Sequence, residues 1–238
     1  MVNKFLQALE YSLLPGQCLL CGQNSQQTLD LCQPCTVSLP WLLSQCASCA
    51  LPLPKPQASQ LCAHCLRKPP PFRRIASPWL YDFPVDTLIN RFKHHKHYAA
   101  GHVLTTMLVE YLCQLYQDQP LPDIIIPTPL HWSRQFRRGF NQSYRLAHTL
   151  SDKLKIPLSQ QLRRHRYTPH QQGLTAKQRR KNLKGAFTVK GDVSGKTIAL
   201  IDDVVTTTAT VTEISHTLLD AGAKAVEIWC LARTPTQR

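Results

Sequence analysis

The sequence predicts an α/β protein with a mostly parallel sheet flanked by helices, preceded by a cysteine-rich zinc-binding module. Three observations support this fold class. Eight of the ten cysteines fall before Arg67, the segments after Trp79 alternate between strand-like and helix-like patterns, and one buried strand ends in the carboxylate pair Asp202-Asp203. Strands that alternate with helices favour a parallel sheet with helices on both faces.

The cysteines form four CxxC pairs, each of which can direct two thiolates toward one tetrahedral metal ion. Two pairs complete a closed four-sulfur site, so the array predicts two structural zinc ions. Disulfides are the competing interpretation, but the first residues show no secretory signal and structural disulfides seldom persist in a reducing compartment. We expect the first two pairs and the last two pairs to bind separately, although interleaved pairing also fits. The predicted ligands are Cys18, Cys21, Cys32, Cys35, Cys46, Cys49, Cys62 and Cys65.

The composition changes near Pro69-Pro70-Pro71, a triplet that resists both helix and sheet and suits a stiff connector. We therefore expect two domains. Residues 1–70 would form an N-terminal helix and the double zinc ribbon, and residues 71–238 the α/β domain. Cys113 and Cys230 fall in a predicted helix and a predicted strand, where we expect buried apolar residues.

Apolar periodicity predicts the elements of the second domain in order. First come a long helix over 86–116, a buried strand over 123–127 and a helix over 141–153. An arginine-rich loop follows. The chain then continues with a short strand over 186–189, a buried strand over 197–201, a helix over 210–221 ended by Gly222, and a strand over 225–232.

The segment from Thr197 to Thr210 combines a buried strand, two carboxylates and a hydroxyl-rich turn that opens a helix. In such an arrangement, backbone N–H groups and the positive end of the helix face a phosphate, while carboxylates accept hydrogen bonds from sugar hydroxyls. The segment therefore predicts a sugar-phosphate site. Taken alone, Asp202 and Asp203 also fit metal ligands or strand-end caps.

The same segment resembles the PRPP-binding motif of type I phosphoribosyltransferases, in which two acidic residues precede a Thr-Thr-Gly type turn. The resemblance implies that Asp202 and Asp203 hold the ribose hydroxyls and that magnesium accompanies bound PRPP. This chain has Thr208 where the family usually has glycine, which tolerates conformations that a β-branched residue resists. The implied 5′-phosphate loop consists of Thr206, Thr207, Thr208, Ala209 and Thr210.

Further motifs extend a resemblance to the ComF/GntX family over nearly the whole chain. They are Leu88 to Lys93, Pro127 to Trp132 with Arg138 to Gln142, and Arg164 to Gln171. Together with the cysteine array, they imply a double zinc ribbon fused to a type I phosphoribosyltransferase-like domain. The residues expected to contact pyrophosphate or DNA phosphate are Arg137, Arg138, Arg164, Arg166, Arg179, Lys181 and Lys93.

The charge balance bears on function, because 28 Lys and Arg against 14 acidic residues leave a formal charge of +14. Such an excess favours polyanionic partners. The resemblance implies a protein that handles single-stranded DNA in natural transformation or DNA utilisation, with PRPP or a nucleotide as small ligand. Family members are thought to act at the inner face of the membrane, with a helicase or another competence protein as partner.

Two alternatives stay open at this point. One is an active phosphoribosyltransferase that transfers ribose 5-phosphate from PRPP to an unknown acceptor. The other is a structural zinc-ribbon adaptor for a protein partner. No run approaches the roughly 18 apolar residues that a membrane span needs, so we expect a cytoplasmic protein without a transmembrane segment.

Overall fold

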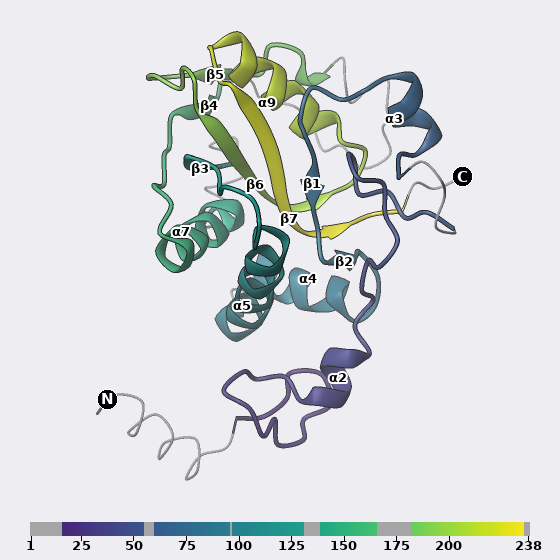
Figure 1. Cartoon of the computed structure of the whole chain (residues 1–238). Helices are drawn as coiled ribbons and strands as arrows, with labels where there is room; N and C mark the ends of the chain where they lie inside the picture. The colour runs from purple at the N-terminus through teal and green to yellow at the C-terminus, as the bar shows by residue number, and fades with distance from the viewer. Residues whose placement is uncertain (1–15, 55–59, 96, 131–138, 166–181, 236–238) are drawn as a thin grey trace.

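The computed structural model describes residues 16–54, 60–95, 97–130, 139–165 and 182–235. Its centre is a five-stranded sheet in the order β1-β7-β6-β3, in which β2 also pairs with β7 (Figure 1). All these pairs are parallel, which confirms the predicted fold class. The strands are β1 (Ile75–Ala76), β2 (Trp79–Leu80), β3 (Ile124–Pro127), β6 (Thr197–Val205) and β7 (Ala225–Arg233).

Helices cover both faces of the sheet (Figure 1). One face carries α4 (Val85–His95), α5 (Tyr98–Leu115) and α7 (Gln142–Leu154), and the other carries α9 (Ala209–Asp220). Side chains along each strand alternate between the two cores, so that Leu200 packs on the α9 side and Ile201 on the α4–α5 side. No helix within the described ranges has the length and apolar composition that a membrane span needs.

Several elements differ from the sequence-based prediction. The long helix expected over 86–116 is two helices, and His97 caps the second by accepting a hydrogen bond from the Ala100 amide. A single helix of that length would extend roughly 45 Å, whereas the break lets both halves pack on one sheet face. The predicted strand at 186–189 is β5 (Phe187–Val189), which pairs antiparallel with β4 (Leu162–Arg164) outside the central sheet.

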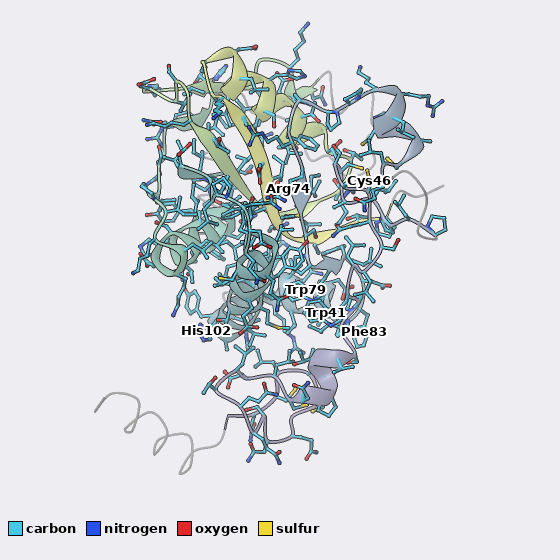
Figure 2. All side chains as sticks on the ribbon, viewed as in Figure 1. Trp41, Cys46, Arg74, Trp79, Phe83 and His102 are labelled. Carbon is cyan, nitrogen blue, oxygen red and sulfur yellow. The ribbon has the colours of Figure 1, made fainter. Side chains whose placement is uncertain are left out.

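Strands β1 and β2 were not predicted, since no apolar run marks them. Ile75 pairs with Ile228 and Trp79 with Ala232, which is the same register, so the two form one interrupted edge strand. Pro78 lies in the interruption and has no N–H to contribute to the sheet. A segment of the N-terminal part lies next to this edge strand and forms two backbone hydrogen bonds with it. The Leu42 N–H donates to Pro78 O, and the Leu80 N–H donates to Pro40 O. Trp41 packs on Trp79 with ring centroids 5.5 Å apart (Figure 2).

The two cysteine groups pack on opposite faces of the sheet. The group containing α2 (Gln33–Val37) shares the α4–α5 core, to which Cys18, Leu31 and Cys32 contribute. The group containing α3 (Ala63–Arg67) shares the α9 core. Figure 1 accordingly shows α2 and α3 at separate places on the molecule. The domain boundary near residue 70 stays a prediction, and the expected N-terminal helix lies outside the described residues.

A buried polar network joins α5 to the sheet. Glu227 on β7 accepts hydrogen bonds from the Tyr116 hydroxyl and from Arg74 Nε at 3.0 Å, and the Trp229 indole donates to Tyr116 at 2.9 Å. Arg74 lies over the middle of the sheet in Figure 2. Burial and the neighbouring Glu227 carboxylate raise the pKa of Tyr116. The phenol therefore stays protonated and serves as a donor inside the core.

Candidate functional site

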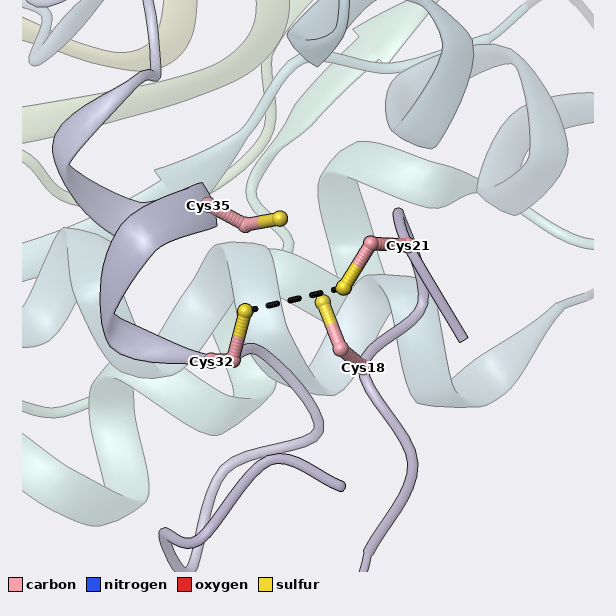
Figure 3. Close-up of side chains that lie close together, drawn as sticks. All are labelled: Cys18, Cys21, Cys32 and Cys35. Carbon is pink, nitrogen blue, oxygen red and sulfur yellow. Dashed lines mark hydrogen bonds between the residues drawn. The ribbon is translucent and has the colours of Figure 1, made fainter. Parts of the chain in front are cut away.

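The cysteines gather into two groups of four. Cys18, Cys21, Cys32 and Cys35 form the first group and Cys46, Cys49, Cys62 and Cys65 the second, with the sulfur atoms of each group within 4.8 Å of one another. Figure 3 shows the four thiols of the first group directed toward a common centre. The chain therefore uses consecutive rather than interleaved pairing.

The sulfur spacing fits zinc. One pair in each group, Cys21–Cys32 and Cys49–Cys62, has a sulfur–sulfur distance of 3.7 Å. Four thiolates at the usual zinc–sulfur bond length of about 2.3 Å stand roughly 3.8 Å apart at the corners of a tetrahedron. Each group thus fits one structural zinc ion, and a four-sulfur shell leaves no open position for catalysis.

The thiols of each group differ in acidity. Burial opposes ionisation of Cys18, but backbone hydrogen bonds from Cys21 and Cys32 outweigh it and lower the pKa of Cys18 to about 6. The same competition lowers the pKa of Cys46 to about 7. Burial raises the pKa of Cys49 to about 11, so this thiol needs the charge of a bound metal to ionise.

The two remaining cysteines were expected to be buried. Cys230 on β7 is fully buried, which agrees with the prediction. Cys113 on α5 is exposed, so that part of the prediction was wrong. The helix is apolar over much of its length, but Cys113 falls on the side that faces away from the sheet.

The carboxylate pair lies inside β6, which continues to Val205 instead of ending at Ile201. Asp203 is buried and accepts from Lys93 Nζ at 2.6 Å and from Gln142 Nε2 at 3.3 Å. Asp202 is half-buried and accepts from the Ser143 hydroxyl at 3.2 Å. Burial and the adjacent Asp203 charge raise the pKa of Asp202 to about 7. The end of α4, the start of α7 and the end of β6 therefore meet at these two carboxyl groups.

The hydroxyl-rich loop follows directly. Thr206 and Thr207 are exposed, and Thr208 has φ of +62° at the N-cap of α9. This is the left-handed region that glycine adopts freely and a β-branched residue adopts at a cost of roughly 1–3 kcal/mol. The Thr208 side chain makes no capping hydrogen bond to α9, which begins at the buried Ala209. Its N–H groups therefore have the orientation that favours an anion.

Sequence reasoning missed Arg233, the last residue of β7. Its guanidinium is buried and donates to four backbone carbonyls, those of Cys49 at 2.9 Å, Val205 at 3.1 Å, Thr234 at 2.7 Å and Thr206. Cys49 is a predicted zinc ligand, and Thr206 begins the phosphate loop. One side chain thus joins the second zinc ribbon to that loop. A cation directly after the apolar run 228–232 was the available signal.

The other missed residues are Gln142 and Ser143, whose side chains contact the carboxylate pair. Among the predicted phosphate contacts, Lys93 lies at the carboxylates, and Arg164 lies on β4 with its guanidinium 5.6 Å from the Phe187 ring centroid. The remaining five lie outside the described residues: Arg137, Arg138, Arg166, Arg179 and Lys181.

The chain is similar to known protein families over both of its parts. A family model for the phosphoribosyl transferase domain matches residues 141–238, and one for the double zinc ribbon domain matches residues 10–70. DNA utilization protein YhgH of Salmonella typhi is 37% identical over 225 residues, which cover 93% of this chain and 98% of that protein. Competence protein F of Haemophilus influenzae is 38% identical over 183 residues, covering 74% and 79%. Glutamine PRPP amidotransferase of B. subtilis, a solved structure, has a TM-score of 0.36 and 20% identity, covering 53% and 25%.

Proposed function

This chain belongs to the ComF/YhgH family of competence and DNA utilization proteins, and we propose that it handles single-stranded DNA and binds PRPP or a related sugar phosphate. The sugar phosphate would occupy the end of β6. The observation that carries this part is the convergence of Asp202, Asp203 and the loop from Thr206 at the start of α9. Open parallel sheets bind ligands at the carboxyl ends of their strands, which is where these groups lie.

The DNA-handling part rests on charge. The chain carries 28 Lys and Arg against 14 acidic residues, far more cations than one sugar phosphate could engage. Two relatives are named for DNA utilization and for competence, and we extend that role to this chain. The zinc ribbons would act as scaffold, since closed four-sulfur sites leave no position for a reacting group.

A second candidate is an active phosphoribosyltransferase, which the same carboxylate pair supports. That reaction breaks the bond between C1 of PRPP and the diphosphate oxygen, forms a bond from C1 to the acceptor, and releases pyrophosphate. Asp202 and Asp203 would hold the ribose hydroxyls, and magnesium would accompany the diphosphate. Thr208 weakens the match to such an enzyme, because the family glycine lets this loop approach its ligand closely.

The test is a titration of zinc-loaded protein with labelled single-stranded DNA at several salt concentrations, with and without magnesium and PRPP. Pyrophosphate is followed in the same samples. We expect affinity that falls steeply with salt, because bound phosphates release counterions, and no pyrophosphate. Absence of DNA binding together with acceptor-dependent pyrophosphate release would replace the proposal with the enzyme.

Matched variants test whether the small ligand binds at the carboxylate pair and the loop that follows it. PRPP with magnesium should raise the melting temperature of the wild type, and the double change Asp202→Asn with Asp203→Asn should abolish the shift. Thr208→Gly should keep or enlarge it, because glycine removes the backbone strain. A PRPP shift that survives loss of both carboxylates would exclude this site.

A further inference from the structure

Away from the carboxylate pair, a cavity of about 800 Å³ opens between α7, the end of β3 and β4. We refer to it as the α7–β4 cavity. Neither Asp202 nor Asp203 is among its lining residues. Its size is within the range of small-molecule pockets. Figure 1 shows α7, β3 and β4 together on one flank of the molecule, away from α2 and α3.

The lining is aromatic and cationic. Among the described lining residues are Phe140 and Tyr144, three arginines (Arg145, Arg163 and Arg164) and His148, and there is no Asp or Glu. The acid next to this set, Asp152, is held by His148 at 3.1 Å. The cavity therefore presents π surfaces beside positive charge, without a carboxylate in its described wall to repel an anion.

The aromatic wall is fixed by stacking. The Arg145 guanidinium lies 4.4 Å from the Tyr98 ring centroid and 5.3 Å from that of Phe140. Tyr144 and His148 stand one turn apart on α7 with their rings 6.2 Å apart. Tyr144, Arg145 and His148 all lie on α7, a regular 13-residue helix with Asn141 as its N-cap. The helix therefore fixes the positions of these three residues relative to one another.

The cationic wall is a strand. Arg163 and Arg164 lie on β4, which pairs with β5 from Leu162 opposite Val189 to Arg164 opposite Phe187. Arg163 is exposed, and Arg164 is half-buried over the Phe187 ring. Both arginines line the same cavity as Phe140 and Tyr144, and guanidinium forks suit phosphate oxygens.

We propose that the α7–β4 cavity is a base-stacking subsite for single-stranded DNA, an inference that rests on the DNA-handling function proposed above. A base would stack on Tyr144, and Arg145 and Arg163 would contact the flanking phosphates. Alternating aromatic and cationic contacts are how proteins hold single strands without reading sequence. A protein partner would favour an apolar patch, and a metal would need clustered acids, histidines or thiols, which the described wall does not offer.

The test compares two labelled strands of about a dozen nucleotides, an oligothymidylate and an abasic strand of equal length, by fluorescence anisotropy. We expect the wild type to bind the base-containing strand more tightly. Tyr144→Leu should weaken that binding about fivefold or more and remove the difference between the strands, while Tyr144→Phe should preserve both. Arg163→Gln should weaken both strands alike and reduce the salt slope by about 1.

The matched charge control is Lys224→Gln, which should leave base discrimination unchanged. Lys224 is an exposed cation just before β7, at the amino ends of the parallel strands, whereas the cavity lies at the carboxyl end of β3. Zinc content and melting temperature of each variant report folding. If the wild type binds neither strand, the proposed function fails. If it binds both strands equally, or if Tyr144→Leu discriminates as the wild type does, DNA handling stands and the stacking subsite is refuted.

Discussion

The two zinc ribbons have similar ligand spacing, ten and twelve residues between their CxxC pairs, but different surroundings. In the first, Cys21 is exposed and Cys35 half-buried, and the exposed Arg91 reaches the Leu19 carbonyl at 3.3 Å. In the second, all four cysteines are buried, Ile75 on β1 donates to Ser48 O, and the buried Arg233 donates to Cys49 O.

The difference shows that a repeated ligand motif need not have a repeated structural role. The first ribbon contributes Cys18, Leu31 and Cys32 to the core under α4 and α5, but part of its cysteine group stays exposed. The second is continuous with the core under α9 and, through Arg233, with the backbone of the predicted phosphate loop.

Loss of one zinc ligand should separate the ribbons most strongly. We expect Cys62→Ser to lower the free energy of unfolding by about 4 kcal/mol or more, because the second site is buried in the main core. Cys21→Ser, in the exposed part of the first site, should cost about half of that or less. Zinc analysis with chemical denaturation checks both, and equal losses of stability would contradict the comparison.

The two arginines that reach the ribbons provide the next test. Arg233→Met removes the donor of the buried Cys49 carbonyl and three further backbone contacts, so we expect a loss of about 3 kcal/mol, or roughly 6–12 °C in melting temperature. Arg91→Met removes an exposed contact and should cost less than about 1 kcal/mol. A larger loss from Arg91→Met than from Arg233→Met would show that the first ribbon, not the second, is the one more tightly joined to the rest of the protein.

The next test concerns Lys93, which lies on α4, the helix that also carries Arg91. Lys93→Met leaves the buried Asp203 carboxylate without its cation, and we expect a loss of about 2 kcal/mol after allowing for partial exposure of the lysine. Adding Asp203→Asn should recover most of it. Denaturation of the two single variants and the double variant measures the coupling, and strictly additive losses would argue against the ion pair.

Asp202 should give the smallest effect, visible as a pH dependence. Its pKa is about 7 in the folded chain and about 3.8 when unperturbed. Between these values the native state binds more protons than the unfolded state, so wild-type stability falls as pH rises through this window. Asp202→Asn cannot ionise, so its stability relative to the wild type should rise as the pH goes from roughly 5 to 8. A difference in melting temperature between the wild type and Asp202→Asn that stays constant across that pH range would exclude the raised pKa.

The sequence was sufficient for features encoded by local pattern. Alternating apolar segments predicted the parallel sheet, and CxxC spacing predicted the four-sulfur groups, because both depend on residues close together in the chain. The Asp202-Asp203 pair and its following turn were likewise found. The sequence also marked Thr208 as a departure from the family glycine. Its left-handed backbone gives the physical reason why glycine is usual at this position.

The features that sequence could not predict depend on residues far apart. Arg233 contacts Cys49 across 184 positions, and Gln142 contacts Asp203 across 61. Strands β1 and β2 have two residues each, too few for a periodic signal, and exist because β7 offers an edge. The break at His97, by contrast, falls in the polar run 93–97, a signal that the prediction of one long helix did not use.

The most direct measurement of the second ribbon's role is amide hydrogen exchange in Cys62→Ser and Cys21→Ser, read at the loop and first turn over residues 206–212. The Arg233 bridge predicts faster exchange of these amides in Cys62→Ser and near wild-type exchange in Cys21→Ser. Unchanged exchange in Cys62→Ser, or equal acceleration in both variants, would contradict a second ribbon that supports the phosphate loop.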